Sequence, residues 1–357
     1  MELAIPLPID PMLAKAVTKI PAPDSVPGGL SYEPKWDGFR CIILRDGDEV
    51  ELSSRGGKPL TRYFPEVVDF VKELLPEKVA VDGELVVRQG EPGRQRLHWE
   101  ALSQRIHPAA SRVAKLAEET PAEFIAFDLL TVAQDALVDR PFAERRARLV
   151  EVCAHLTPSE PVHLTRTTDD PELAERWFSE FEGAGLDGVV AKPLADPYSP
   201  GKRTMLKIKH SRTAELVPYG YRVHKSGSGV GSILLGLYDA DGNLLPVGGA
   251  SAFTNAYRQQ LVDELEPLVV RDDDGEVVKA ATDRSRFSGS KDTSFVPLQP
   301  ELVIEVQFDQ LEGNRLRHAA RFLRWRPDRD PRSCTLAQIE RAPEYDLAEV
   351  LADPAKG

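Results

Sequence analysis

The segment Lys35-Trp36-Asp37-Gly38, with Arg40 two residues beyond it, carries side chains that could perform covalent chemistry on a phosphate. A lysine amine can bond to phosphorus once its ammonium group has lost a proton, and neighbouring cations or a metal ion favour that loss. The segment precedes a predicted strand, which would hold the lysine in place. Taken alone, the pattern favours a surface lysine before an Asp-Gly turn.

Several further motifs follow in order along the chain. Asp82-Gly83-Glu84-Leu85 lies in an apolar predicted strand, where a central glutamate is unfavourable unless it binds something. Phe127 alone would be interpreted as a core residue. The remaining motifs are Ser54-Arg55-Gly56, Phe127-Asp128-Leu129-Leu130, residues 187–192, residues 206–209 and residues 324–329.

In this order and spacing, the motifs resemble those of the covalent nucleotidyltransferases, the superfamily of ATP-dependent polynucleotide ligases and messenger-RNA capping enzymes. The resemblance runs from Glu33 to Arg329. The sequence around these motifs is similar to that of the actinobacterial C-type ATP-dependent DNA ligases. The similar segments include EPKWDGFR, FIAFDLL, GLDGVVAKP and RWRPDRDPRSCT. It implies an enzyme that uses ATP to seal 5′-phosphate/3′-hydroxyl nicks in DNA repair, through a lysyl-AMP and a DNA-adenylate intermediate.

The resemblance also implies a role for each matching residue. Lys35 would be the nucleophile, and the catalytic set would be Lys35, Asp37, Lys207 and Lys209. Nucleotide and phosphate groups would be bound by Glu33, Arg40, Arg55, Glu84, Phe127, Lys192, Lys207, Arg326 and Arg329. A divalent metal ion, Mg²⁺ or Mn²⁺, would contact Glu84 and Asp187.

The resemblance further implies which part of the substrates each of these residues would contact. Glu33 would read the adenine edge, Phe127 would stack on the base, and Arg40 with Glu84 would hold the ribose. Arg55 would meet the 5′-phosphate of the nick, and Lys207 with Lys209 would grip the α-phosphate of ATP. Asp37 would act near the 3′-hydroxyl in the last step.

Two positions depart from the family pattern. Asp187 stands where the fourth motif usually begins with glutamate, which keeps the charge but shortens the reach to a metal ion. Arg329 stands where the last motif usually ends in lysine, which keeps the charge but changes the hydrogen-bond geometry.

The composition is that of a soluble globular chain. The 357 residues carry 45 Lys and Arg against 57 Asp and Glu, a net charge of −12, yet seven arginines cluster between Arg315 and Arg332. Three scattered cysteines are too few for a disulfide framework, and the chain has neither an apolar run long enough to span a membrane nor a secretory signal. We therefore expect a cytoplasmic protein with no membrane partner.

The order of predicted elements indicates two domains. Short strands and amphipathic helices alternate up to Lys209, and closely spaced strands with one helix follow. We predict an α+β adenylation domain of packed antiparallel sheets with helices at residues 1–210. An OB-fold β-barrel with a short, loose C-terminal tail would occupy residues 211–357.

Two other functions remain open from the sequence. The first is an RNA ligase or another lysyl-nucleotidyltransferase, because these enzymes share the motifs. The second is a non-enzymatic oligonucleotide-binding module, which the presence of Lys35, Lys192, Lys207 and Lys209 disfavours. For a ligase, we expect a monomer that acts on nicked duplex DNA, with repair proteins as possible partners in trans.

Overall fold

The structure is a computed structural model, and it describes residues 1–281, 293–309, 311–339 and 343–352. The chain forms two compact units, one made of Met1–Lys209 with Ala342–Gly357 and the other of His210–Arg341. The division after Lys209 lies one residue before the boundary expected from the sequence. Within the described residues, no helix combines the length and the apolar character that crossing a membrane requires.

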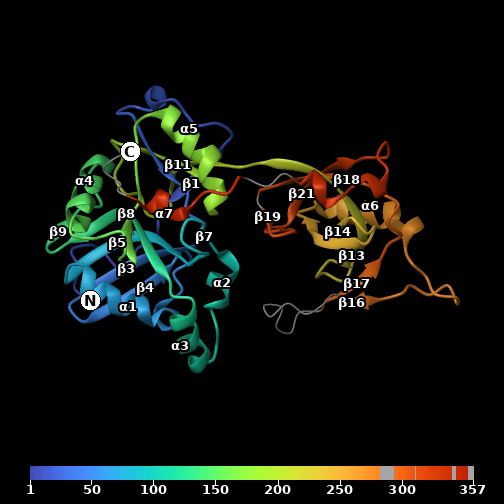
Figure 1. Cartoon of the computed structure of the whole chain (residues 1–357), viewed down its shortest axis with the longest axis horizontal. Helices are drawn as coiled ribbons and strands as arrows, with labels where there is room; N and C mark the ends of the chain where they lie inside the picture. Colours follow the sequence, from blue (N-terminus) through green and yellow to red (C-terminus); the bar gives the residue numbers. More distant parts are fainter. Residues whose placement is uncertain (282–292, 310, 340–342, 353–357) are drawn as a thin grey trace. The chain divides into compact units, whose positions relative to one another are not determined.

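The first unit contains two packed sheets (Figure 1). The smaller sheet has the order β1-β12-β11-β2, with bounds Leu13–Val17, Arg203–Lys209, Gly188–Pro193 and Leu30–Pro34. The larger sheet has the order β10-β8-β5-β3-β4, with bounds Val162–Leu164, Glu123–Val132, Lys78–Val86, Phe39–Asp46 and Glu49–Ser54; β9 (Asp135–Ala136) pairs with β8. All these strand pairs are antiparallel except β1 with β12 and β10 with β8.

Apolar side chains fill the space between the sheets and the space beneath the helices. One cluster joins Ile42 and Leu130 of the larger sheet to Met205 of the smaller sheet, so the two sheets face each other. The outer face of the larger sheet packs against the helices α1 (Pro65–Leu74), α2 (Trp99–Gln104) and α4 (Phe142–Cys153). The helix α5 (Pro171–Glu180) covers the smaller sheet. The sequence did not predict α2, α3 (Ala110–Glu119) or the short hairpin of β6 (Arg88–Gln89) and β7 (Arg96–Leu97).

The second unit is a closed barrel. Its strands β13 (Arg212–Val223), β14 (Val230–Tyr238), β15 (Leu244–Ser251), β21 (Ala320–Trp325) and β18 (Ile304–Phe308) pair in that order, and β18 pairs back onto β13. The helix α6 (Asn255–Leu265) follows the third barrel strand, and β16 (Ala280–Ala281) and β17 (Ser294–Pro297) extend the sheet. Five closed strands with a helix after the third match the predicted OB-fold.

The C-terminal segment differs from the loose tail expected from the sequence. Residues Leu347–Leu351 form the helix α7, and Leu347 is only 1% exposed. Its apolar face packs with Trp36 and Trp177 of the first unit. Asp346 Oδ1 accepts a hydrogen bond from Gln95 N at 3.0 Å. The prediction of a loose tail is therefore wrong for this helix, because its apolar residues complete a core that lies far away in the sequence.

Candidate active site

The ladder between β2 and β11 brings Lys35 and Asp187 together. Lys35 N donates to Gly188 O at 2.8 Å, and Asp187 N donates to Lys35 O at 2.9 Å, so the pairing continues past the end of β2. Lys35 thus lies opposite the fourth motif, which is more than 150 residues away in the chain. This register places both side chains at the same end of the smaller sheet.

The Asp187 carboxylate is shared between two lysines. Its Oδ2 lies 2.6 Å from Lys35 Nζ and 2.6 Å from Lys209 Nζ. Burial alone would raise the pKa of Asp187, but the two ammonium groups outweigh it and the pKa is lowered. Asp187 is therefore a carboxylate at neutral pH, and it holds Lys35 and Lys209 close together.

Glycine is required in the motif at Asp187 for a steric reason. Gly188 has a φ of +132°, and a Cβ there would lie 2.0 Å from Ile208 O. The backbone of β11 can approach β12 this closely only without a side chain at that position. The Asp-Gly pair thus holds the Asp187 carboxylate beside Lys209.

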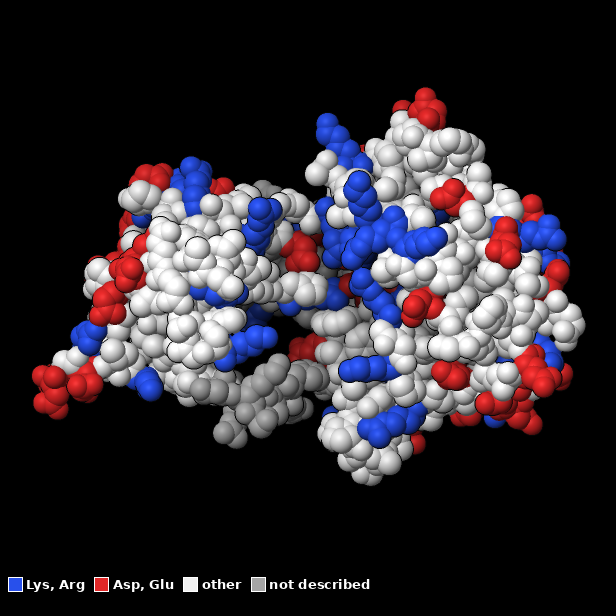
Figure 2. All heavy atoms as spheres, turned by 180° about the vertical axis from the view of Figure 1, so that it is seen from behind, with Lys and Arg blue, Asp and Glu red and all other residues white. Residues whose placement is uncertain are grey.

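Lys207 and Arg55 add positive charge to the same region. Burial lowers the pKa of Lys207, and the positive charges of Lys209 and Lys35 lower it further. Arg55 contributes in the same direction from the exposed turn after β4. Lysines and arginines also gather on the face of the first unit seen at the right of Figure 2, although the chain as a whole is acidic.

Arg40 is oriented by a carboxylate, Asp82, to which the sequence analysis assigned no role. Asp82, with 0% exposure, accepts hydrogen bonds from Arg40 Nε and Nη2 at 2.6 Å each. Tyr198 donates its hydroxyl proton to the same carboxylate at 2.6 Å and accepts a bond from Met12 N at 3.0 Å. Burial would lower the pKa of Arg40, but Asp82 raises it. The role of Asp82 could have been predicted, because a polar residue in an apolar strand requires a partner. No feature of the sequence indicated a role for Tyr198.

Glu84 is a carboxyl group whose pKa is strongly raised by its surroundings. Burial raises the pKa of Glu84 to about 7, even though Arg40 and Lys35 both favour its charged form. Its Oε1 accepts a hydrogen bond from Gly38 N at 3.2 Å. A Cβ at Gly38 would lie 2.0 Å from Leu85 O, so the glycine of the first motif allows this close approach of the two strands.

Glu33, Lys192 and Phe127 form a third group. Lys192 Nζ lies 2.8 Å from Glu33 Oε1 and donates to Phe127 O at 3.1 Å. Arg40 Cζ and Lys192 Nζ lie 4.3 Å and 4.6 Å from the centre of the Phe127 ring. Because Phe127 is only 4% exposed, side chains that now cover its ring must move before a base can stack on it.

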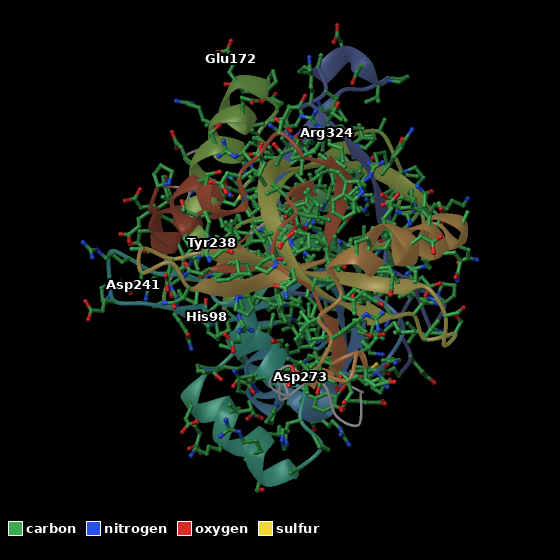
Figure 3. All side chains as sticks on the ribbon, turned by 90° about the vertical axis from the view of Figure 1, so that its right-hand side faces the viewer. His98, Glu172, Tyr238, Asp241, Asp273 and Arg324 are labelled. Carbon is green, nitrogen blue, oxygen red and sulfur yellow. The ribbon has the colours of Figure 1, made fainter. Side chains whose placement is uncertain are left out.

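The remaining predicted residues are Asp37, Arg326 and Arg329. Asp37, two residues after Lys35, is partly exposed. Arg326 and Arg329 belong to the second unit, where both form ion pairs with Glu215. Arg326 also forms two hydrogen bonds with Asp328, at 2.9 and 2.8 Å. Arg324, labelled in Figure 3, precedes them on β21 and donates to Glu305 at 2.6 Å.

The described part of the chain contains no group of three or more His, Cys, Asp or Glu side chains arranged to hold a metal ion. Mg²⁺ at nucleotide sites is typically bound by one or two carboxylates together with phosphate and water oxygens. Glu84 and Asp187 fit that kind of coordination, in which the nucleotide supplies part of the ligand set.

A lysine among other cations, in a domain that is followed by an OB-fold barrel, is the arrangement that the motifs imply for an enzyme that transfers a nucleotide through a covalent intermediate. Residues 11–209 match the family described as ATP dependent DNA ligase domain, and residues 226–329 match the ATP dependent DNA ligase C terminal region. The chain belongs to the ATP-dependent DNA ligases, enzymes that use ATP as a substrate and form phosphodiester bonds.

Individual relatives agree with this assignment over the whole chain. DNA ligase C1 of Mycolicibacterium smegmatis is 52% identical over 358 residues, which cover 99% of this chain and 100% of that protein. DNA ligase C of Mycobacterium tuberculosis is 52% identical over 364 residues, which cover 98% and 99%. The resemblance to C-type ligases is therefore confirmed.

A solved structure of a Lig E DNA ligase has the same fold. It covers 89% of this chain and 100% of its own, with a TM-score of 0.54 and 16% sequence identity. The predicted fold class, an adenylation domain followed by an OB-fold, is confirmed.

Proposed function

We propose that this chain seals nicks in duplex DNA with Lys35 as the residue that carries AMP. The observation that supports the assignment most directly is the convergence of the motifs at one end of the smaller sheet, where Asp187 bridges Lys35 and Lys209 at 2.6 Å each. Lys207 and Arg55 add positive charge near them. A nucleophile surrounded by cations suits attack on a phosphate.

In the first step, Lys35 Nζ forms a bond to the α-phosphorus of ATP and loses a proton, while the bond to the β-phosphate oxygen breaks and pyrophosphate leaves. AMP then passes to the 5′-phosphate of the nick and frees Lys35. In the last step, the 3′-hydroxyl attacks that phosphate, a phosphodiester bond forms and AMP is expelled. Lys207 and Lys209 stabilise the charge that develops on the phosphoryl oxygens.

The other roles are distributed around this reaction. Glu33 and Phe127 bind the adenine, Arg40 and Glu84 hold the ribose, and Lys192 keeps Glu33 in position through their contact at 2.8 Å. Arg55 binds the 5′-phosphate of the nick, and Asp37 acts at the 3′-hydroxyl.

Glu84 and Asp187 would hold a divalent ion, Mg²⁺ or Mn²⁺, which supplies charge neutralisation at the phosphates when bound. Arg326 and Arg329 would contact pyrophosphate in the first step. We further propose that the enzyme acts as a monomer in the cytoplasm, with DNA-repair proteins as partners in trans.

A sealing assay on a nicked duplex, labelled on the 5′-phosphate at the nick, tests the proposal. The assay compares ATP, GTP and NAD⁺, and it uses DNA or RNA as the strand that carries the 3′-hydroxyl. We expect a joined product with ATP on the all-DNA nick and none for Lys35→Ala. Joining only with the RNA strand would move the function to RNA repair.

A further inference from the structure

Two buried polar atoms of the first unit, one on Glu33 and one on Arg146, lack hydrogen-bond partners. Glu33 Oε2 has none, although Glu33 is only 4% exposed and its other carboxylate oxygen contacts Lys192. Arg146, on α4, also has a buried Nη1 without a partner, while its Nη2 donates to Thr165 O. Buried polar atoms are rarely left unpaired in proteins, so an unpaired acceptor and an unpaired donor point to a ligand.

The two side chains are close enough to affect each other. Burial lowers the pKa of Arg146, and the Glu33 carboxylate opposes that change. Burial raises the pKa of Glu33, and Lys192 and Arg146 oppose it. The same Lys192 ammonium lies 4.6 Å from the centre of the Phe127 ring, so the Glu33 carboxylate lies in the neighbourhood of that ring.

Each side chain is also held in place by its paired atom. Thr165, which is 1% exposed, accepts from Arg146 through its backbone oxygen and from Trp36 Nε1 through its hydroxyl at 2.8 Å. Trp36 follows Lys35 directly. Arg146 is therefore linked through a single residue to the segment that carries the nucleophile.

We propose that Arg146 is a base-specificity residue, whose Nη1 donates to one of the ring nitrogens beside the 6-amino group of adenine while Glu33 Oε2 accepts from that amino group. Adenine presents this combination of an acceptor nitrogen next to an amino donor. A 6-oxo purine would instead turn an oxygen toward the Glu33 carboxylate and be disfavoured. This inference rests on the proposed function and adds a residue to which the resemblance assigns no role.

The test uses analogues of ATP that lack one ring nitrogen. The rate of lysyl-AMP formation is measured with ATP, 1-deaza-ATP and 7-deaza-ATP for the unmodified enzyme and for Arg146→Met. We expect Arg146→Met to lower kcat/KM for ATP by about 10- to 100-fold, the effect of losing a hydrogen bond from a charged group. In this variant, ATP and one of the deaza analogues should react equally well, whereas the unmodified enzyme should prefer ATP.

The matched control is Arg148→Met, an exposed arginine on the same helix whose charge pairs with Glu151. It should retain the rate and the preference of the unmodified enzyme. If Arg146→Met were slower but kept the full preference for ATP over both analogues, Arg146 would have only a structural role and the inference would be wrong. Failure of the unmodified enzyme to form any lysyl-AMP would instead overturn the proposed function.

Discussion

Acidic residues of the two units differ in how far water reaches them. In the first unit, Asp82 and Asp187 have side chains 0% and 4% exposed, and each contacts at least one cation at 2.6 Å. In the second unit, Asp328 pairs with Arg326 at 2.8 Å with its side chain 63% exposed. The ionic contacts are similar in length, but of these three carboxylates only Asp328 is freely reached by water.

This difference in exposure has energetic consequences. A buried ion pair that loses one partner leaves an uncompensated charge away from water, whereas an exposed pair is screened and contributes little. The charges of the first unit are therefore fixed before substrate arrives. Under the proposed function, Arg326 and Arg329 would give up their contacts with Glu215 to bind pyrophosphate.

The largest expected effect is at the nucleophile. Lys35→Ala should reduce formation of the covalent AMP adduct by more than about 1,000-fold, because no other amine replaces its Nζ. Labelling with ATP that carries ³²P at the α-phosphate measures the adduct. Arg326→Ala should slow the labelling but still give a detectable adduct, and Lys72→Ala, an exposed site on α1, should not change it. If Lys35→Ala and Arg326→Ala reduced formation of the AMP adduct equally, the expected contrast between the units would be wrong.

The next largest difference between the units is expected in the effect of a substitution on the free energy of unfolding. Asp82→Asn should lower the free energy of unfolding by about 3 kcal/mol, because Arg40 would keep its charge without a buried counterion. Asp328→Asn should cost much less, because water screens the exposed ion pair that Asp328 forms with Arg326. Chemical denaturation of both variants gives the comparison, and similar destabilisation of the two would contradict it.

The pH dependence of stability sharpens the contrast further. The folded-state pKa of Glu84 is about 7, above its ordinary value of 4.5. The stability that the neutral carboxyl group contributes is therefore lost as the pH rises from 4.5 to 7. Glu84→Gln should therefore gain about 1–2 kcal/mol of stability relative to the unmodified enzyme between pH 4.5 and pH 8. Asp328 has its pKa lowered to about 2 by Arg326, so its contribution is present above 3.8 and lost only as pH falls toward 2. Denaturation at several pH values measures both pH dependences. A stability advantage of Glu84→Gln that grew as the pH fell would contradict the raised pKa of Glu84.

The smallest effect is expected at Arg329. Arg329→Lys restores the residue of the usual family pattern and keeps the charge beside Glu215, whose Oε2 lies 3.1 Å from Arg329 Nε. The rate of adduct formation should stay within about threefold of the unmodified enzyme. The same assay on Arg326→Lys provides the control, because that substitution removes two hydrogen bonds to Asp328 and should cost more. A tenfold loss for Arg329→Lys would show that the guanidinium geometry itself is needed.

Much of the site could be predicted from the sequence because each motif has local features. Lys35 comes directly after a strand, and Glu84 lies in an apolar strand where a carboxylate requires a reason. The strands β3, β4, β5 and β8 were all expected, and their pairing puts Arg40 opposite Glu84. The order of the motifs then identified the fold and the reaction without any knowledge of distances.

The supporting contacts could not be predicted in the same way. Tyr198 reaches Asp82 across 116 positions of the chain, and Asp346 reaches Gln95 across 251. Neither pair belongs to a periodic pattern, because each forms only when separate parts of the fold meet. Arg146 lies in an amphipathic helix with several arginines, and only the structure shows that one of its nitrogens is buried without a partner.

The packing of α7 on the first unit links two distant parts of the sequence. Leu347, Val350 and Leu351 share an apolar core with Trp36, which follows Lys35 directly. Removing α7 would expose this core to water and loosen the segment that carries Lys35. The loss of α7 should therefore lower both the stability of the first unit and the rate of adduct formation, although α7 carries no residue of the proposed site.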